Sequence, residues 1–310
     1  MPLSLRRGTV SAVVEQHEEL VRLEVDDVPC IAYPRVTGAV EIGDEVLVNV
    51  QARELELGSG GFDVVYANLT RGLELPAEEG AHVMVLPYTP LQHARLHVEE
   101  VDALEADLRG LPVVCCSLHS QVAPVCAGLK GLRVAYVQLA GGALPVSLSD
   151  TLRTLRELGL VAASAAVAPC FDADVQCVSV ASGLAWARAG HDAVVCAIGP
   201  GIVGTGTRFG HGGLAAAEAA NAALSLGGVP VIASRVSGAD ERARHRGLSH
   251  HTEAVLALVR GEPVLGQDGD GWRDACEGLP LSHMGRGPDD DPEFFAAAYA
   301  AGVAAKQLAG

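Results

Sequence analysis

Lysine is nearly absent from this chain of 310 residues: only Lys130 and Lys306 occur, and arginine supplies almost all of the positive charge. A Schiff-base lysine, or the lysine of a phosphate-binding P-loop, would have to be one of these two residues. Lys130 lies in a glycine-rich turn and Lys306 in a predicted C-terminal helix, so neither stands in a suitable motif. The sequence therefore disfavours both kinds of chemistry.

Paired cysteines and long apolar runs are also lacking. The eight cysteines form no C-x-x-C pair, and most have valine, alanine or leucine neighbours, which is typical of reduced core thiols in a cytoplasmic protein. The longest uncharged run, residues 111–129, contains Pro112 and Pro124 and makes a poor membrane span. No signal-peptide stretch is found in residues 1–14. We expect a soluble protein that stays in the cytoplasm.

Basic residues are few, because 38 acidic residues face 22 basic ones and the formal net charge is −16. Such a surface repels phosphate backbones and anionic head groups, so neither a nucleic acid nor a membrane is an expected partner. A small molecule is the expected partner, and a homo-oligomer is compatible with the composition. With 49% hydrophobic residues the chain can bury a large core, and its length predicts about two domains.

Residues 1–75 are predicted to form a small β-barrel. Five short segments alternate apolar and polar residues, favour β-branched side chains and end at turns: residues 8–14, 20–25, 29–33, 45–50 and 62–67. The segment lacks the basic groove and exposed aromatic platform of a nucleic-acid-binding barrel. We therefore expect it to have a structural or oligomerising role.

Residues 80–310 are predicted to form an α/β domain, because apolar runs alternate with helical segments. The expected strands are residues 82–86, 111–116, 132–138, 161–167, 193–198 and 229–235. The expected helices are residues 119–129, 148–158, 178–188, 214–226, 249–259 and 292–307, with an irregular loop at 266–292. The fold class is thus α/β, with a small N-terminal β-barrel followed by a Rossmann-like, largely parallel α/β sandwich.

A glycine-rich loop, residues 199–213, follows one predicted strand, at the sheet edge where parallel sheets bind ligands. It has seven glycines and two threonines in 15 residues, so its backbone N–H groups can approach an anion. The spacing Gly199-x-Gly201-x-x-Gly204 matches the dinucleotide fingerprint, but later glycines postpone the helix to about residue 214, which disfavours NAD or FAD. The alternative is a tight crossover loop. The predicted ligand-binding residues are Gly201, Gly204, Thr205, Gly206 and Thr207.

A second loop carries most of the chemistry-bearing side chains. Residues 235–251 hold four arginines and three histidines, a local positive field suited to a carboxylate or phosphate. We expect the strand before this loop to be the parallel neighbour of strand 193–198, so that both loops meet. The predicted ligand-binding residues are Arg244, Arg246 and Ser249, and the predicted catalytic residues are His245, His250, His251 and, from another loop, His119. The alternative is a solvated loop whose arginines pair with Asp240 and Glu241.

No tightly bound structural metal is predicted, and the sequence identifies no cofactor. His250 and His251 are adjacent, and adjacent helical side chains point about 100° apart, so both cannot easily face one ion. A metal site that uses one of them with His245, or with His119 from a neighbouring loop, is geometrically possible. Among the histidines of the candidate loops no pair has the i, i+4 spacing, and the sequence has no C-x-x-C pair. Cys115 and Cys116 lie near His119, but buried cysteines at a strand end are usually inert.

Several longer motifs carry a resemblance to a known family. They are Tyr88-Thr89-Pro90-Leu91-Gln92, Gly141-Gly142-Ala143-Leu144-Pro145, Gly199-Pro200-Gly201-Ile202-Val203-Gly204-Thr205-Gly206-Thr207 and Arg244-His245-Arg246-Gly247-Leu248-Ser249-His250-His251-Thr252. In this order the motifs resemble the bacterial domain-of-unknown-function 3866 family, which implies no activity. Ala140 stands where that family leads us to expect an aspartate, so an acid there is not essential. We expect a hydrolase or transferase acting on an anionic small molecule, or alternatively a non-catalytic metabolite sensor or assembly protein.

Overall fold

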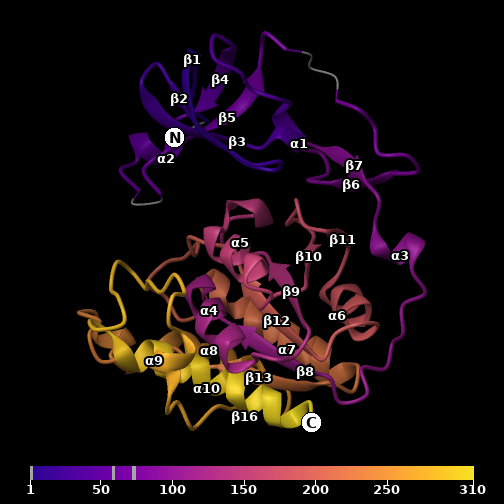
Figure 1. Ribbon diagram of the computed structural model, residues 1–310, viewed down its shortest axis with the longest axis vertical. Helices are drawn as coiled ribbons and strands as arrows, with labels where there is room; N and C mark the ends of the chain where they lie inside the picture. Colours follow the sequence, from indigo (N-terminus) through magenta and orange to yellow (C-terminus); the bar gives the residue numbers. More distant parts are fainter. Residues whose placement is uncertain (1–2, 58–59, 72–74) are drawn as a thin grey trace. The chain divides into compact units, whose positions relative to one another are not determined.

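The computed structural model describes residues 3–57, 60–71 and 75–310 of the chain, which divides into two compact units, Met1–Ala94 and Arg95–Gly310. The first unit holds a closed barrel with the strand order β1-β2-β3-β5-β4 (Figure 1). In β2, alternate residues face the barrel core because successive strand side chains point to opposite faces. The five predicted barrel strands are confirmed as β1 (Leu5–Gln16), β2 (Val21–Val25), β3 (Val28–Ala32), β4 (Glu45–Asn49) and β5 (Asp63–Asn68), with short helices α1 (Pro34–Thr37) and α2 (Gln51–Glu54).

The predicted strand at residues 82–86 does not join the parallel sheet, so that prediction is wrong. β6 (Val83–Val85) pairs with β7 (His93–Arg95) in a separate two-stranded sheet. Directly after β6, Leu86 and Tyr88 have positive φ angles of 50° and 59°, which turn the chain. The strand therefore finds its partner a few residues further along the chain.

The second unit contains a seven-stranded sheet in the order β11-β10-β9-β12-β8-β13-β16, and every strand pair in it is parallel. Its strands are β8 (Pro112–Cys116), β9 (Val134–Leu139), β10 (Ala163–Val167), β11 (Val175–Cys177), β12 (Ala193–Ile198), β13 (Val229–Ala233) and β16 (Val264–Leu265). The Rossmann-like sandwich is confirmed. The prediction missed β11 and β16, which are too short to show a periodic pattern.

Helices cover both faces of this sheet (Figure 1). One face packs against α6 (Val180–Arg188), α7 (Ala215–Ser225) and α8 (His250–Leu258), and the other against α4 (Val122–Gly128), α5 (Asp150–Glu157) and α10 (Pro292–Leu308). The remaining short helices are α3 (Val98–Val101) and α9 (Trp272–Ala275), of which α9 interrupts the predicted irregular loop. Side chains of consecutive β8 residues lie in the hydrophobic cores on opposite faces of the sheet, which explains why the strand is a continuous apolar run.

Within the described chain, no helix combines the length and the apolar character needed to cross a membrane.

All eight cysteines are buried and free. Burial raises the pKa of the Cys115 and Cys116 thiols well above the usual value, so neither is a ready thiolate nucleophile. The structure therefore supports the packing role of these residues.

The strand order corrects one expectation about the site. β8 lies between β12 and β13, so the strands that lead into the glycine loop and the histidine-arginine loop are not neighbours. All strands are parallel, however, and their carboxyl ends lie at one edge of the sheet. The loops still meet, because η3 (Gly212–Leu214), at the end of the glycine loop, contacts α8.

Candidate functional site

The first residues of the glycine loop pack closely against the backbone of another loop. The loop after β9, residues 140–145, lies directly against it: Ala143 N–H donates to the Pro200 carbonyl at 2.8 Å, and Val203 N–H donates to the Gly141 carbonyl at 2.9 Å. A Cβ atom on Gly142 would lie 2.2 Å from the Gly199 carbonyl oxygen, closer than real contacts allow. The crossover-loop alternative thus explains the glycines at the base of the loop.

The tip of the glycine loop is exposed and bonds mainly to itself. Thr205 N–H donates to the Gly210 carbonyl at 2.6 Å, and the hydroxyls of Thr205 and Thr207 lie 2.8 Å apart. Gly206 faces another part of the chain: a Cβ atom there would lie 3.9 Å from the guanidinium carbon of Arg244. Gly206, one of the predicted ligand-binding residues, therefore lies close to an arginine of the second loop.

The arginines of the second loop separate into two groups. The buried Asp240 carboxylate accepts two hydrogen bonds of 2.9 Å from Arg242, and further ones from Arg235 at 3.3 Å and Arg286 at 3.4 Å. Chiefly through the bonds from Arg242, these partners hold the pKa of Asp240 well below its usual range. Arg244 and Arg246 are exposed and form no ion pair with any residue that the structure describes.

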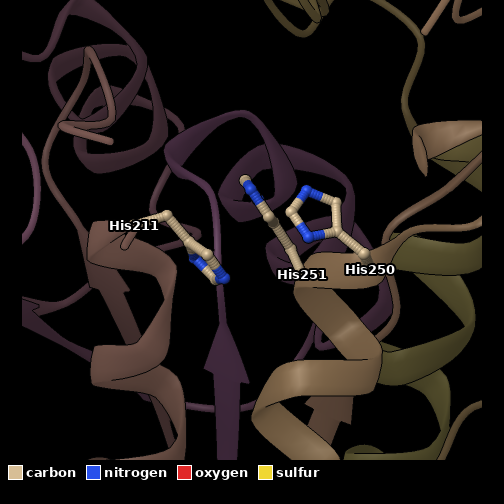
Figure 2. Close-up of side chains that lie close together, drawn as sticks. All are labelled: His211, His250 and His251. Carbon is tan, nitrogen blue, oxygen red and sulfur yellow. The ribbon is translucent and has the colours of Figure 1, made fainter. Parts of the chain in front are cut away.

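Four histidines lie together beside this arginine group. His211 ends the glycine loop, His245 lies in the short 3-10 helix η4 (Ala243–His245), and His250 and His251 form the first turn of α8. The ring centroids of His211 and His251 are 3.7 Å apart and stacked, and those of His245 and His250 are 4.7 Å apart. Figure 2 shows three of these rings projecting toward one another from two segments. We call these four residues the histidine cluster.

All four imidazoles of the histidine cluster have lowered pKa values, mainly because burial disfavours the charged ring. The pKa falls to about 3 for His245 and about 2 for His251, with the Arg235 charge as a further cause in both. The rings are therefore neutral near pH 7, and each has one nitrogen lone pair.

The hydrogen bonds of the cluster differ from ring to ring. His245 Nδ1 lies 2.7 Å from Ser249 Oγ, and His251 Nδ1 accepts from Arg235 Nη1 at 3.2 Å. Ser249 also caps α8, since its Oγ accepts from the His251 N–H at 3.2 Å. Ser249 is thus buried, and it positions the His245 ring and the first turn of α8.

The predicted site residue His119 has a separate set of partners. Its Nδ1 donates to the Ile198 carbonyl at 3.1 Å, and its Nε2 accepts from Ser149 Oγ at 2.6 Å. Burial lowers the pKa of His119 to about 4. Across the described residues its ring contacts Tyr136 and none of the histidine cluster, so the structure does not bring it to the other predicted catalytic residues.

His211 is the residue that sequence reasoning missed. Its neighbours in the chain are glycines, and its ring partners come about 40 residues later, so no local spacing indicates its role. The available signal was its place at the end of a glycine-rich loop, on the same sheet edge as the three histidines of the second loop.

Comparison with known proteins gives a family and no activity. A family model described as "Protein of unknown function (DUF3866)" matches residues 29–265, a range that includes both loops and the whole histidine cluster. This match confirms the resemblance carried by the sequence motifs. A search of curated proteins finds no match.

Proposed function

The chain belongs to the DUF3866 family, which is described as a protein of unknown function, so its function must be inferred from the site. We propose that the protein is an enzyme, a hydrolase or transferase, that acts on an anionic small molecule. The observation that carries the proposal is the Arg244 guanidinium, which lies against Gly206 without a carboxylate partner in the described chain.

The free Arg244 side chain supports an anion site. Arg244 is exposed and has no carboxylate partner among the described residues, whereas neighbouring Arg242 is already bound to Asp240. The missing side chain of Gly206 lets a ligand approach backbone and guanidinium together. Arg246, also exposed, adds positive charge in the same loop. A carboxylate or phosphate group fits this arrangement better than a neutral ligand.

The histidine cluster supports catalysis over simple binding. His250 is less buried than His211, His245 and His251, and its pKa is lowered first by burial and then by the charge of Arg244. A neutral imidazole beside a bound anion can accept a proton from an attacking water or hydroxyl group. A metabolite sensor, the alternative function, needs the anion cradle but no neighbouring neutral imidazoles.

Calorimetric titration tests the anion site. Protein freed of metal by chelation is titrated with inorganic phosphate and with malonate, in the wild type and in Arg244→Gln and Arg260→Gln. We expect Arg244→Gln to weaken binding about tenfold, about 1.4 kcal/mol, as for loss of one charge-assisted contact. Arg260 is a matched control, an exposed arginine that precedes β16 at the opposite sheet edge. Equal binding by both variants, or no binding by the wild type, contradicts the proposal.

A second measurement separates the enzyme from the sensor. Release of p-nitrophenolate from the anionic substrate p-nitrophenyl phosphate is followed for the wild type and His250→Gln. We expect turnover to fall by about 10²–10⁴-fold, the usual contribution of a general base, while phosphate affinity changes little. Tight anion binding without any turnover favours the sensor.

A further inference from the structure

Three members of the histidine cluster offer nitrogen atoms to a common space. One ring nitrogen each from His211, His250 and His251 lies within 4.8 Å of the other two (Figure 2). We propose that these residues bind a divalent transition-metal ion of the zinc class. The ion would join the end of the glycine loop to the first turn of α8.

Unpartnered nitrogens are the strongest argument for a ligand here. His211 is 6% exposed, and both of its ring nitrogens are buried; the Arg208 backbone approaches the ring, but outside ordinary hydrogen-bond geometry. His250 Nε2 is buried without a partner as well. Buried polar atoms are rarely left unpaired in folded proteins, because they lose hydration and gain nothing in return. An ion that accepts these lone pairs removes that cost.

The donor set selects the kind of ion. Three imidazoles, without thiolate or carboxylate among them, suit zinc, nickel, cobalt or copper, whereas magnesium and calcium need oxygen ligands. The three rings are neutral, as metal ligation requires. Three protein ligands leave a fourth position of a tetrahedral ion for water, which is the pattern of catalytic zinc sites.

Two side chains must adjust when the ion binds. An ion lies in the plane of each imidazole that ligates it, so one ring of the stacked His211–His251 pair must turn out of the stack. His251 uses its lone pair to accept from Arg235, so this bond must also be released, which leaves Arg235 paired with Asp240. Nearby arginine charge opposes a cation, so we expect a weaker, exchangeable site in place of a structural one.

The metal site rests on the proposed function only in that it shares His250 with the proposed catalytic site. A bound ion would occupy the lone pair that His250 otherwise offers for proton transfer, and its water would be the reactive group in that case. Anion binding depends instead on Gly206 and Arg244. The two proposals therefore fail independently.

Cobalt titration tests the metal site. Untagged, full-length, chelator-treated protein is titrated with Co²⁺ and followed by visible absorption, and Zn²⁺ is then added as a competitor. We expect one equivalent of Co²⁺ with the intense bands of a tetrahedral ion, and at least a tenfold loss of affinity in His211→Ala and in His250→Ala. His191→Ala is the control, since His191 precedes β12 at the opposite sheet edge.

One further variant, Arg244→Gln, and measurements of folding and of phosphate binding distinguish the possible outcomes. His250 is only partly buried, so His250→Ala should fold even if His211→Ala does not, as circular dichroism will show. Arg244→Gln should not weaken Co²⁺ binding, and His211→Ala should leave phosphate binding to metal-free protein within about threefold. The proposal is overturned if Co²⁺ does not bind stoichiometrically, or if it binds folded His250→Ala as tightly as the wild type.

Discussion

Two arginines separated by one residue have opposite surroundings. Arg242 bonds twice to the buried Asp240, whereas Arg244 is exposed beside Gly206. The same residue type therefore stabilises the loop at one position and is free for a ligand at the other. The sequence shows four arginines in this loop and gives no means of separating them, because the pairing depends on where Asp240 is buried.

Substitution of these arginines should separate stability from binding. We expect Arg242→Gln to lower the free energy of unfolding by about 1–2 kcal/mol, less than a fully buried charged hydrogen bond contributes, since Arg242 is partly exposed. Arg244→Gln should change it by less than about 0.5 kcal/mol. Urea unfolding measures both, and the reverse order of effects would contradict the assignment.

His119 should make the fold sensitive to mild acid. Its pKa is about 4 in the folded protein and close to 6.5 in the unfolded chain, so between these values the unfolded state binds the extra proton. Its contribution is fully present above pH 6.5 and is lost as the pH falls toward 4, by up to about 3 kcal/mol. Urea unfolding at pH 7 and pH 4.5 should show a smaller pH dependence for His119→Gln than for the wild type. An unchanged pH dependence would show that folding does not lower the pKa of His119.

At the scale of elements, long periodic segments were predictable and short ones were not. The barrel strands and the helices from α4 to α8 follow from their own residues, and Ser149 and Ser249 mark two helix starts by capping. β11 and β16 have three and two residues, so only their partners define them. The strand order depends on contacts between distant segments, which is why β8 was not expected between β12 and β13.

The sequence was sufficient to locate the two loops of the candidate site, but not the contacts that its histidines make. The rule that ligands bind at the carboxyl edge of a parallel sheet led to both loops. His211 and the separate surroundings of His119 come from tertiary packing, in which residues far apart in the sequence become neighbours. The predicted ligand and catalytic roles of these residues stay predictions.

The close packing of the glycine loop against the loop after β9, residues 140–145, predicts the effect of a substitution there. Gly142→Ala should lower the free energy of unfolding by about 1–3 kcal/mol, because the added Cβ would lie 2.2 Å from the Gly199 carbonyl oxygen and must push the loops apart. Gly190→Ala is the matched control, since its Cβ would meet nothing closer than 3.8 Å. Thermal unfolding of both variants decides the matter, and equal stability would show that the loops separate at no cost.

At the scale of the whole molecule, the proposed chemistry occupies one sheet edge of the second unit. Most of a surface of net charge −16 repels anions. Arg244 and Arg246, which have no carboxylate partner among the described residues, would therefore direct an anion to this edge of the sheet. The first unit, Met1–Ala94, contributes none of the proposed site residues. Its structural or oligomerising role, and the presence of a homo-oligomer, stay predictions.

The central claim is that an anion binds to the Arg244 guanidinium where that group lies beside Gly206. Crystals grown with arsenate, a phosphate analogue with an anomalous signal, test it directly. We expect an anomalous arsenic peak about 4 Å from the Arg244 guanidinium nitrogens, so that arsenate oxygens lie at hydrogen-bond distance, about 3 Å, from these nitrogens and from the Gly206 backbone. Arsenate bound only elsewhere on the molecule, with none at this sheet edge, would contradict it.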